Sequence, residues 1–149
     1  MSRTYDVSEK MILGFDMFLK TIFNTQKARR PSPGVNLEEI ELSEEVRRDI
    51  AGMMRVNHTG EVCAQALYDG QAFVADETET RESLTKAAQE EQDHLAWCYE
   101  RLNQLSAAPS VLNPFFYLSS FAIGVVAGKF GDKLLSLIHI SEPTRRRLI

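Results

Sequence analysis

The stretch EEQDHLAW, residues 90–97, places an acid and an imidazole on the apolar side of a predicted helix. Glu91 and His94 are three residues apart, about 60° around an α-helix, so their side chains project in the same direction. Both lie on the stripe that carries the apolar residues of this helix, which are Leu84, Ala87, Ala88, Leu95, Cys98, Leu102 and Leu105. Because a buried ionisable pair needs a compensating partner, this stretch bears on both the fold and the chemistry.

A second acid falls on an apolar stripe in RVNHTGE, residues 55–61. When the segment is wound as a helix, Glu61 lies among the apolar residues Val46, Ile50, Met53, Ala64, Leu67 and Tyr68. This helix is predicted to begin near Ser43 and to end at about Val74. The polar stretch ADETET, residues 75–80, interrupts the pattern, and the next helix is predicted from roughly Arg81 to Ser106. The two helices together predict an antiparallel helical hairpin.

The hairpin predicts that the two acids and the imidazole meet. Glu61 lies 15 residues before position 76 and Glu91 lies 15 after it, so both carboxylates reach the same height on either side of a turn centred there. No lysine or arginine on the same stripe could neutralise them. A divalent cation could, and two carboxylates with one imidazole suit iron or manganese better than a structural zinc. A partly exposed, salt-bridged face or an error in the helix phasing would explain the same residues.

The N-terminal segment is predicted to be a short amphipathic helix over residues 8–23, with Ser8 as its N-cap. Its apolar residues at helical spacing are Ile12, Phe15, Leu19, Ile22 and Phe23. KARRPSPG, residues 27–34, then stops the helix and forms a linker. An apolar face next to a basic patch could lie on an anionic membrane or dock against the protein's own core.

A stretch of 19 uncharged residues runs from Ser110 to Gly128. Pro114 suits the first turn of a helix, and Gly124 with Gly128 forms a G-x-x-x-G pattern that permits close helix packing. The stretch is barely long enough for a bilayer and contains polar residues, so it predicts a bundle helix with an apolar face rather than a transmembrane span.

Composition and charge bound the remaining possibilities. The 149 residues are 44% hydrophobic and 26% charged, which is typical of one globular domain. A net charge of −4 does not favour binding to nucleic acid, whose backbone is negatively charged. No secretion signal is evident at the N-terminus. Cys63 and Cys98 lie outside any metal-binding spacing and are interpreted as small buried hydrophobes in a reducing compartment. His58 is interpreted as a polar surface histidine rather than as a partner of the metal ligands.

The last segment breaks with the pattern that precedes it. LLSLIHISEPTRRRLI, from Leu134 onward, loses its apolar periodicity after Ile140 and resembles an in-frame translation of a sequencing adapter. We therefore divide the chain into an amphipathic helix with its linker (1–36), a helical hairpin with an apolar third helix (37–134), and a non-native tail (135–149).

Three longer phrases carry a resemblance to a known family. MRVNHTGEVCAQALYDGQA (54–72), EEQDHLAWCYERL (90–102) and SVLNPFFY (110–117) are similar to the bacterial demethoxyubiquinone hydroxylases of ubiquinone biosynthesis, and the similarity covers roughly residues 40 to 133. A glutamate on one helix with E-x-x-H on the next is also half of the ferritin-like carboxylate di-iron pattern. The resemblance implies an all-α, ferritin-like four-helix bundle of which this chain is the N-terminal portion.

The resemblance further implies an oxidoreductase: a monooxygenase that hydroxylates the ring of a demethoxyubiquinol precursor with molecular oxygen. Its cofactor would be iron, with two ions in the complete site, reduced by NADH or the quinol. Glu61, Glu91 and His94 match the first three iron ligands, Glu91 in the bridging position, and no catalytic residue beyond these ligands is implied. The apolar segment 111–127 would guide a polyprenyl benzoquinol from the bilayer, so a peripheral location on the cytoplasmic side of the bacterial cell membrane is expected.

The family pattern continues with another glutamate and a second E-x-x-H, which this sequence does not match. A truncated reading frame holding half of the metal site is therefore expected. One alternative is a ferritin-like iron-binding protein whose hairpin completes a di-iron site by homodimerisation. A second alternative is a metal-storage protein of the same superfamily, but such a protein would have no evident use for the uncharged stretch 110–128. A third alternative is a non-catalytic helical protein on a membrane surface, in which the acids on the apolar stripes would be half exposed.

Overall fold

The computed structural model describes residues 6–23, 27–34, 41–75 and 78–130. Four helices follow one another in these ranges: α1 (Val7–Ile22), α2 (Glu44–Val74), α3 (Thr78–Gln104) and α4 (Asn113–Phe130). The described residues contain no β-strand, which confirms the predicted all-α fold. The tail predicted over residues 135–149 lies outside the described ranges.

The N-cap of helix α1 lies two residues before the predicted one, so the prediction of Ser8 as the cap is wrong. Asp6 takes that place: its side chain accepts a hydrogen bond from the Val7 amide at 2.7 Å, and its own amide donates to Glu9 at 3.0 Å. The Ser8 hydroxyl donates to the Asp6 carboxylate instead. A carboxylate at this position is favoured because it satisfies free amide groups and faces the positive end of the helix dipole.

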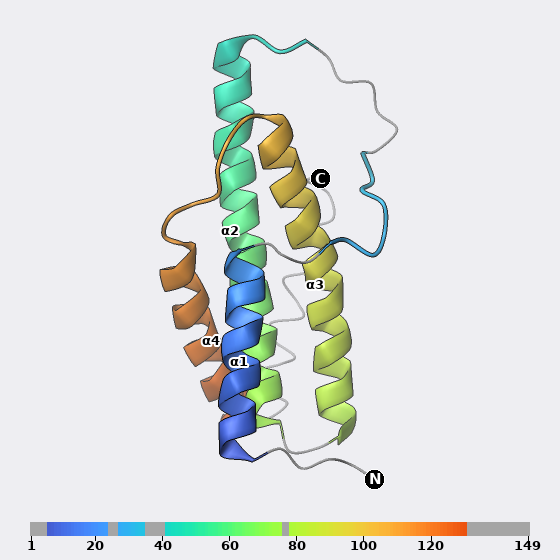
Figure 1. Ribbon diagram of the computed structural model, residues 1–149, viewed down its shortest axis with the longest axis vertical. Helices are drawn as coiled ribbons and strands as arrows, with labels where there is room; N and C mark the ends of the chain where they lie inside the picture. Colours follow the sequence, from blue (N-terminus) through green and yellow to red (C-terminus); the bar gives the residue numbers. More distant parts are fainter. Residues whose placement is uncertain (1–5, 24–26, 35–40, 76–77, 131–149) are drawn as a thin grey trace.

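Helices α2 and α3 form the predicted antiparallel hairpin (Figure 1). The side chain of Ser43 caps α2 by accepting from the Val46 amide at 3.4 Å, with acidic residues in the first turn. Beyond α3, Ser106 adopts a left-handed backbone conformation with φ of 55°, which turns the chain away from the helix.

Helix α4 runs parallel to α2 and packs along it (Figure 1). Glycines make this approach close: a Cβ atom on Gly124 would lie 2.3 Å from the Leu67 carbonyl oxygen, and one on Gly70 would lie 2.3 Å from that of Phe121. A Cβ atom on Gly128 would meet the Val74 side chain and the Gln71 backbone. The close packing predicted from the G-x-x-x-G pattern is therefore confirmed.

Helix α1 packs against α2 and α4, so the alternative in which it docks on the protein's own core is correct. Phe18 meets the ring of Tyr117 edge-on at 5.2 Å, and Ile22 packs against the same cluster of buried residues, which are Val62, Ala66, Leu95 and Tyr117. The helix nevertheless leaves Met11, Ile12 and Phe15 more than 60% exposed. Within the described part of the chain, no helix combines the length and apolarity that crossing a bilayer requires.

Candidate metal centre

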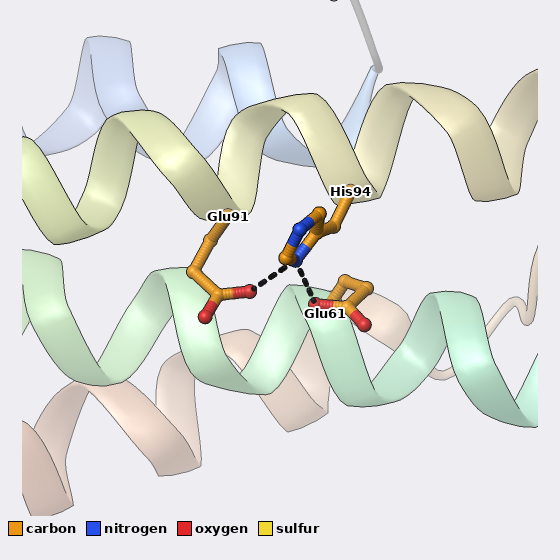
Figure 2. Close-up of side chains that lie close together, drawn as sticks. All are labelled: Glu61, Glu91 and His94. Carbon is orange, nitrogen blue, oxygen red and sulfur yellow. Dashed lines mark ion pairs between the residues drawn. The ribbon is translucent and has the colours of Figure 1, made fainter. Parts of the chain in front are cut away.

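The hairpin brings the three predicted ligands together. Glu61 lies in the middle of α2, and Glu91 and His94 lie one turn apart on α3, with all three side chains pointing into the space between the helices (Figure 2). His94 Nδ1 is 3.4 Å from a carboxylate oxygen of Glu91 and 3.9 Å from one of Glu61. One potential ligand atom from each residue lies within 4.8 Å of the others, so the helix phasing inferred from the sequence holds.

Burial distinguishes this cluster from a surface salt bridge. Glu61 is 3% exposed and Glu91 is 7% exposed, whereas the side chain of His94 is one third exposed. Their neighbours in sequence, Val62 and Leu95, belong to the apolar core. The explanation by a partly exposed, salt-bridged face is therefore wrong for both acids.

The electrostatics of the cluster are those of excess negative charge. The hydrogen bond to Glu91 raises the pKa of His94 above its ordinary value, against the effect of burial, and the charges of Glu91 and Glu61 act in the same direction. A single imidazolium cannot neutralise two buried carboxylates, and removing such charges from water costs several kcal/mol for each ion. A bound divalent cation would offset this cost with the same three side chains as ligands.

The donor set suits one class of metal ion. Carboxylate oxygens with a single imidazole nitrogen are ligands for iron or manganese, whereas structural zinc sites use thiolates and more histidines. In the ranges that the structure describes, this is the only group of three or more potential ligands within such reach. Cys98 is buried as predicted, whereas Cys63 is only partly buried.

The interpretation of His58 as a surface histidine is wrong. His58 is completely buried, one turn before Glu61 on α2, and burial lowers its pKa to about 4. The neutral ring can therefore accept a hydrogen bond from the Asn113 side chain, whose nitrogen lies 3.2 Å from His58 Nδ1. The Thr59 hydroxyl also donates to the side-chain amide oxygen of Asn113 at 2.9 Å. His58 thus fixes the start of α4 on the part of α2 that carries Glu61.

A second buried polar group lies further along α2 and was missed in the sequence. Asp69 is 2% exposed and accepts hydrogen bonds from the Tyr117 hydroxyl at 2.7 Å and the Gln65 side-chain nitrogen at 3.0 Å. Burial raises the pKa of Asp69 to about 6 in spite of these two hydrogen bonds. The spacing of Glu61, Gln65 and Asp69, four residues apart each time, could have revealed a polar line on one face of α2.

Comparisons with known proteins agree on one family. The model of the ubiquinone biosynthesis protein COQ7 family matches residues 48–141. The 3-demethoxyubiquinol 3-hydroxylase of Pseudomonas aeruginosa is 52% identical over 134 residues, 89% of this chain and 62% of the relative. The enzyme of the same name from Nitrosospira multiformis is 50% identical over 125 residues, 84% of this chain and 60% of the relative.

The relatives are longer than the present chain, which spans about 60% of their length. The 3-demethoxyubiquinol 3-hydroxylase of Xanthomonas oryzae follows the same pattern: it is 47% identical over 131 residues, which are 88% of this chain and 60% of the relative. No solved structure gives a significant match.

Proposed function

This chain belongs to the COQ7 family of ubiquinone biosynthesis proteins, and we propose that it carries half of the di-iron site of a 3-demethoxyubiquinol 3-hydroxylase. The reaction is a monooxygenation: one atom of molecular oxygen enters the quinol ring, and two electrons and two protons reduce the other atom to water. NADH, or the quinol itself, is the proposed source of the electrons.

The observation that carries the proposal is the convergence of two buried carboxylates and an imidazole on one hairpin of a chain that belongs to this family. Glu61 and Glu91 would each supply oxygen ligands, and His94 would supply a nitrogen ligand. Iron held there would supply the activation of oxygen that ring hydroxylation requires. The residues also fit the metal because they bring more negative charge into the core than the imidazole can balance.

The protein's own residues would prepare the site for this chemistry. Val62 and Leu95, beside the ligands in the sequence, belong to the buried core and exclude water from one side of the cluster. The ligands sit on two helices of a packed hairpin rather than on loops, which keeps their relative positions fixed. Asn113 and His58 join α4 to the ligand-bearing part of α2.

A membrane-bound, polyprenyl substrate fits the outer faces of α1 and α4, which lie side by side (Figure 1). Their apolar residues that are more than half exposed include Met11, Ile12, Phe15, Phe115, Leu118, Ile123, Val126 and Phe130. Exposed apolar residues in such number are typical of a surface that contacts lipid or another protein. We assign the protein a peripheral position on the cytoplasmic side of the bacterial membrane, with its substrate drawn from the bilayer.

An isotope experiment tests the proposed function. The protein with both halves of the di-iron site is purified, loaded with ferrous iron, placed with demethoxyubiquinol and NADH in phospholipid vesicles, and exposed to ¹⁸O₂. We expect a hydroxylated quinol that contains one ¹⁸O atom, as measured by mass spectrometry. Glu91→Gln should reduce its formation to background, whereas Glu90→Gln, the same change at the exposed neighbouring residue, should leave it unchanged. A product without ¹⁸O, or equal activity in the two variants, would contradict the proposal.

A further inference from the structure

The linker that follows α1 is bound to α3 at the residue next to a candidate ligand. The Arg29 amide donates to one carboxylate oxygen of Asp93 at 2.7 Å, and the Arg30 side chain donates through Nε to the other at 2.7 Å. Asp93 is only 3% exposed. Figure 1 shows the linker, residues 27–34, passing beside α3. A segment 63 residues earlier in the chain is thus hydrogen-bonded to α3 at the residue immediately before His94.

Trp97 connects the same linker with the imidazole itself. Its indole N–H donates to the Arg30 carbonyl oxygen at 3.0 Å, and the Arg30 guanidinium lies 5.6 Å from the centre of the indole ring. The His94 ring lies 5.3 Å from the Trp97 ring, tilted by 42°. Arg30 and His94 are therefore both in contact with the indole.

These contacts act on a ligand that the hairpin covers only in part. The His94 side chain is one third exposed, so the linker adds contacts beside the imidazole that the two hairpin helices do not supply. Metal affinity depends strongly on the groups that orient the ligands, and loss of such a group typically weakens binding by about 10- to 100-fold. Arg30 contacts residues on both sides of His94 in the sequence. Its side chain is hydrogen-bonded to Asp93, immediately before His94, and its carbonyl oxygen is hydrogen-bonded to Trp97, whose ring packs against the imidazole.

We propose that Arg30 of the linker is a positioning residue for the metal centre, which orients the His94 imidazole through Asp93 and Trp97. This inference rests on the proposed function, because it assigns His94 as a ligand. It gives the N-terminal segment a role at a site to which it contributes no ligand.

Arg29 provides a matched control for a binding experiment. Its side chain donates to Gln89 at 3.0 Å, and only its backbone amide contacts Asp93. Arg30→Ala and Arg29→Ala therefore remove the same charge from adjacent positions, but only the first removes the side-chain hydrogen bond to Asp93 and the guanidinium from the indole ring. The hydrogen bonds of the linker backbone, from the Arg29 amide to Asp93 and from Trp97 to the Arg30 carbonyl oxygen, can form in both variants. In an anaerobic titration with Co²⁺, we expect Arg30→Ala to weaken affinity about tenfold and Arg29→Ala less than twofold. Arg30→Lys should restore part of the loss, since it keeps the charge without the planar guanidinium.

A measurement without metal separates this inference from the proposed function. The ¹⁵N and ¹H resonances of the His94 imidazole report its surroundings in the metal-free protein, and we expect Arg30→Ala to shift them while Arg29→Ala leaves them in place. If the unaltered protein binds no Co²⁺ but the shift occurs, the proposed function fails and the positioning of the ring stands. If the two variants have the same Co²⁺ affinity, or neither shifts the resonances, Arg30 does not position His94.

Discussion

At the scale of single residues, four of the described acids are less than 10% exposed, and they differ in how their charge is compensated: Glu61, Asp69, Glu91 and Asp93. Asp93 is compensated by two arginines: burial acts to raise its pKa, but the hydrogen bonds and charges of Arg29 and Arg30 outweigh this effect and hold the pKa below its ordinary value. Glu61 and Glu91 share one imidazole. The approach of two buried carboxylates to one partly exposed imidazole is what distinguishes the candidate metal centre from a surface ion pair.

Asp69 leads to a prediction about pH. Its folded-state pKa of about 6 lies above the value of 3.8 that it has when exposed. The folded protein therefore holds this proton more tightly than the unfolded chain, so Asp69 should make unfolding easier as the pH rises from about 4 to about 6. Asp69→Asn removes the titration, so the stability of the unaltered protein should fall relative to this variant by about 2–3 kcal/mol over that range.

Urea unfolding at pH 4 and pH 7 measures this difference. Asp16→Asn provides a control, because Asp16 is half exposed on α1 and pairs with Lys20 at the surface. The difference in free energy of unfolding between Asp16→Asn and the unaltered protein should change by less than about 1 kcal/mol over the same pH range. If the free energies of unfolding of Asp69→Asn and the unaltered protein differ by the same amount at pH 4 and pH 7, Asp69 does not titrate in this way.

The residues of the site were predictable to the extent that they obey helix periodicity. Glu61, Glu91 and His94 each fall on an apolar stripe, and that pattern exists within each helix alone. His58 was misjudged because a lone histidine in a polar stretch is normally exposed, and its partner Asn113 lies 55 residues away. The contact of Arg30 with Asp93 could not be predicted from the neighbouring sequence either, since a basic linker indicates only a segment that faces water or a membrane.

At the scale of helices, the fold depends on how closely α4 approaches α2. Gly124 faces the backbone of α2, and a methyl group there would meet the Leu67 carbonyl oxygen, which cannot rotate away. We expect Gly124→Ala to destabilise the protein by about 1–3 kcal/mol, because the helices must separate to accept the added atom.

Gly52, in α2, is the natural comparison for this prediction. A Cβ atom there would meet nothing within 4 Å, so Gly52→Ala should stabilise the protein by up to about 1 kcal/mol through its better helix propensity. Thermal unfolding of both variants measures the two effects. If Gly124→Ala were as stable as Gly52→Ala, the close packing of α2 and α4 would be wrong.

The helices themselves were largely predictable, since amphipathic stripes, capping residues and linkers with proline or glycine are local signals. The predicted starts and ends of α2 and α3 agree with the structure to within a few residues. Apart from the antiparallel hairpin of α2 and α3, the sequence did not predict the direction of each helix relative to the others or which helices pack against one another. Nothing local specifies that α4 lies parallel to α2, because that choice depends on which faces fit together in three dimensions.

At the scale of the whole molecule, α2 is the central element, with α1, α3 and α4 packed around it (Figure 1). The apolar outer faces of α1 and α4 are proposed to meet the membrane, whereas the candidate metal centre lies between α2 and α3 (Figure 2). The linker joins these two regions, because it continues from α1 and ends its contacts beside His94. The family resemblance seen in the sequence is confirmed by the comparisons, and with it the ferritin-like, all-α class of the fold.

The central claim is that Glu61, Glu91 and His94 bind iron, and the most direct test is anaerobic titration with Fe²⁺ followed by measurement of iron per chain. We predict that the unaltered protein and Glu90→Gln retain iron after gel filtration, and that Glu91→Gln loses it while remaining folded by circular dichroism. The mass of the iron-bound species shows in the same experiment whether a second copy of the chain completes the site. Equal iron content in Glu91→Gln and Glu90→Gln, or no iron in the unaltered protein, would contradict the claim.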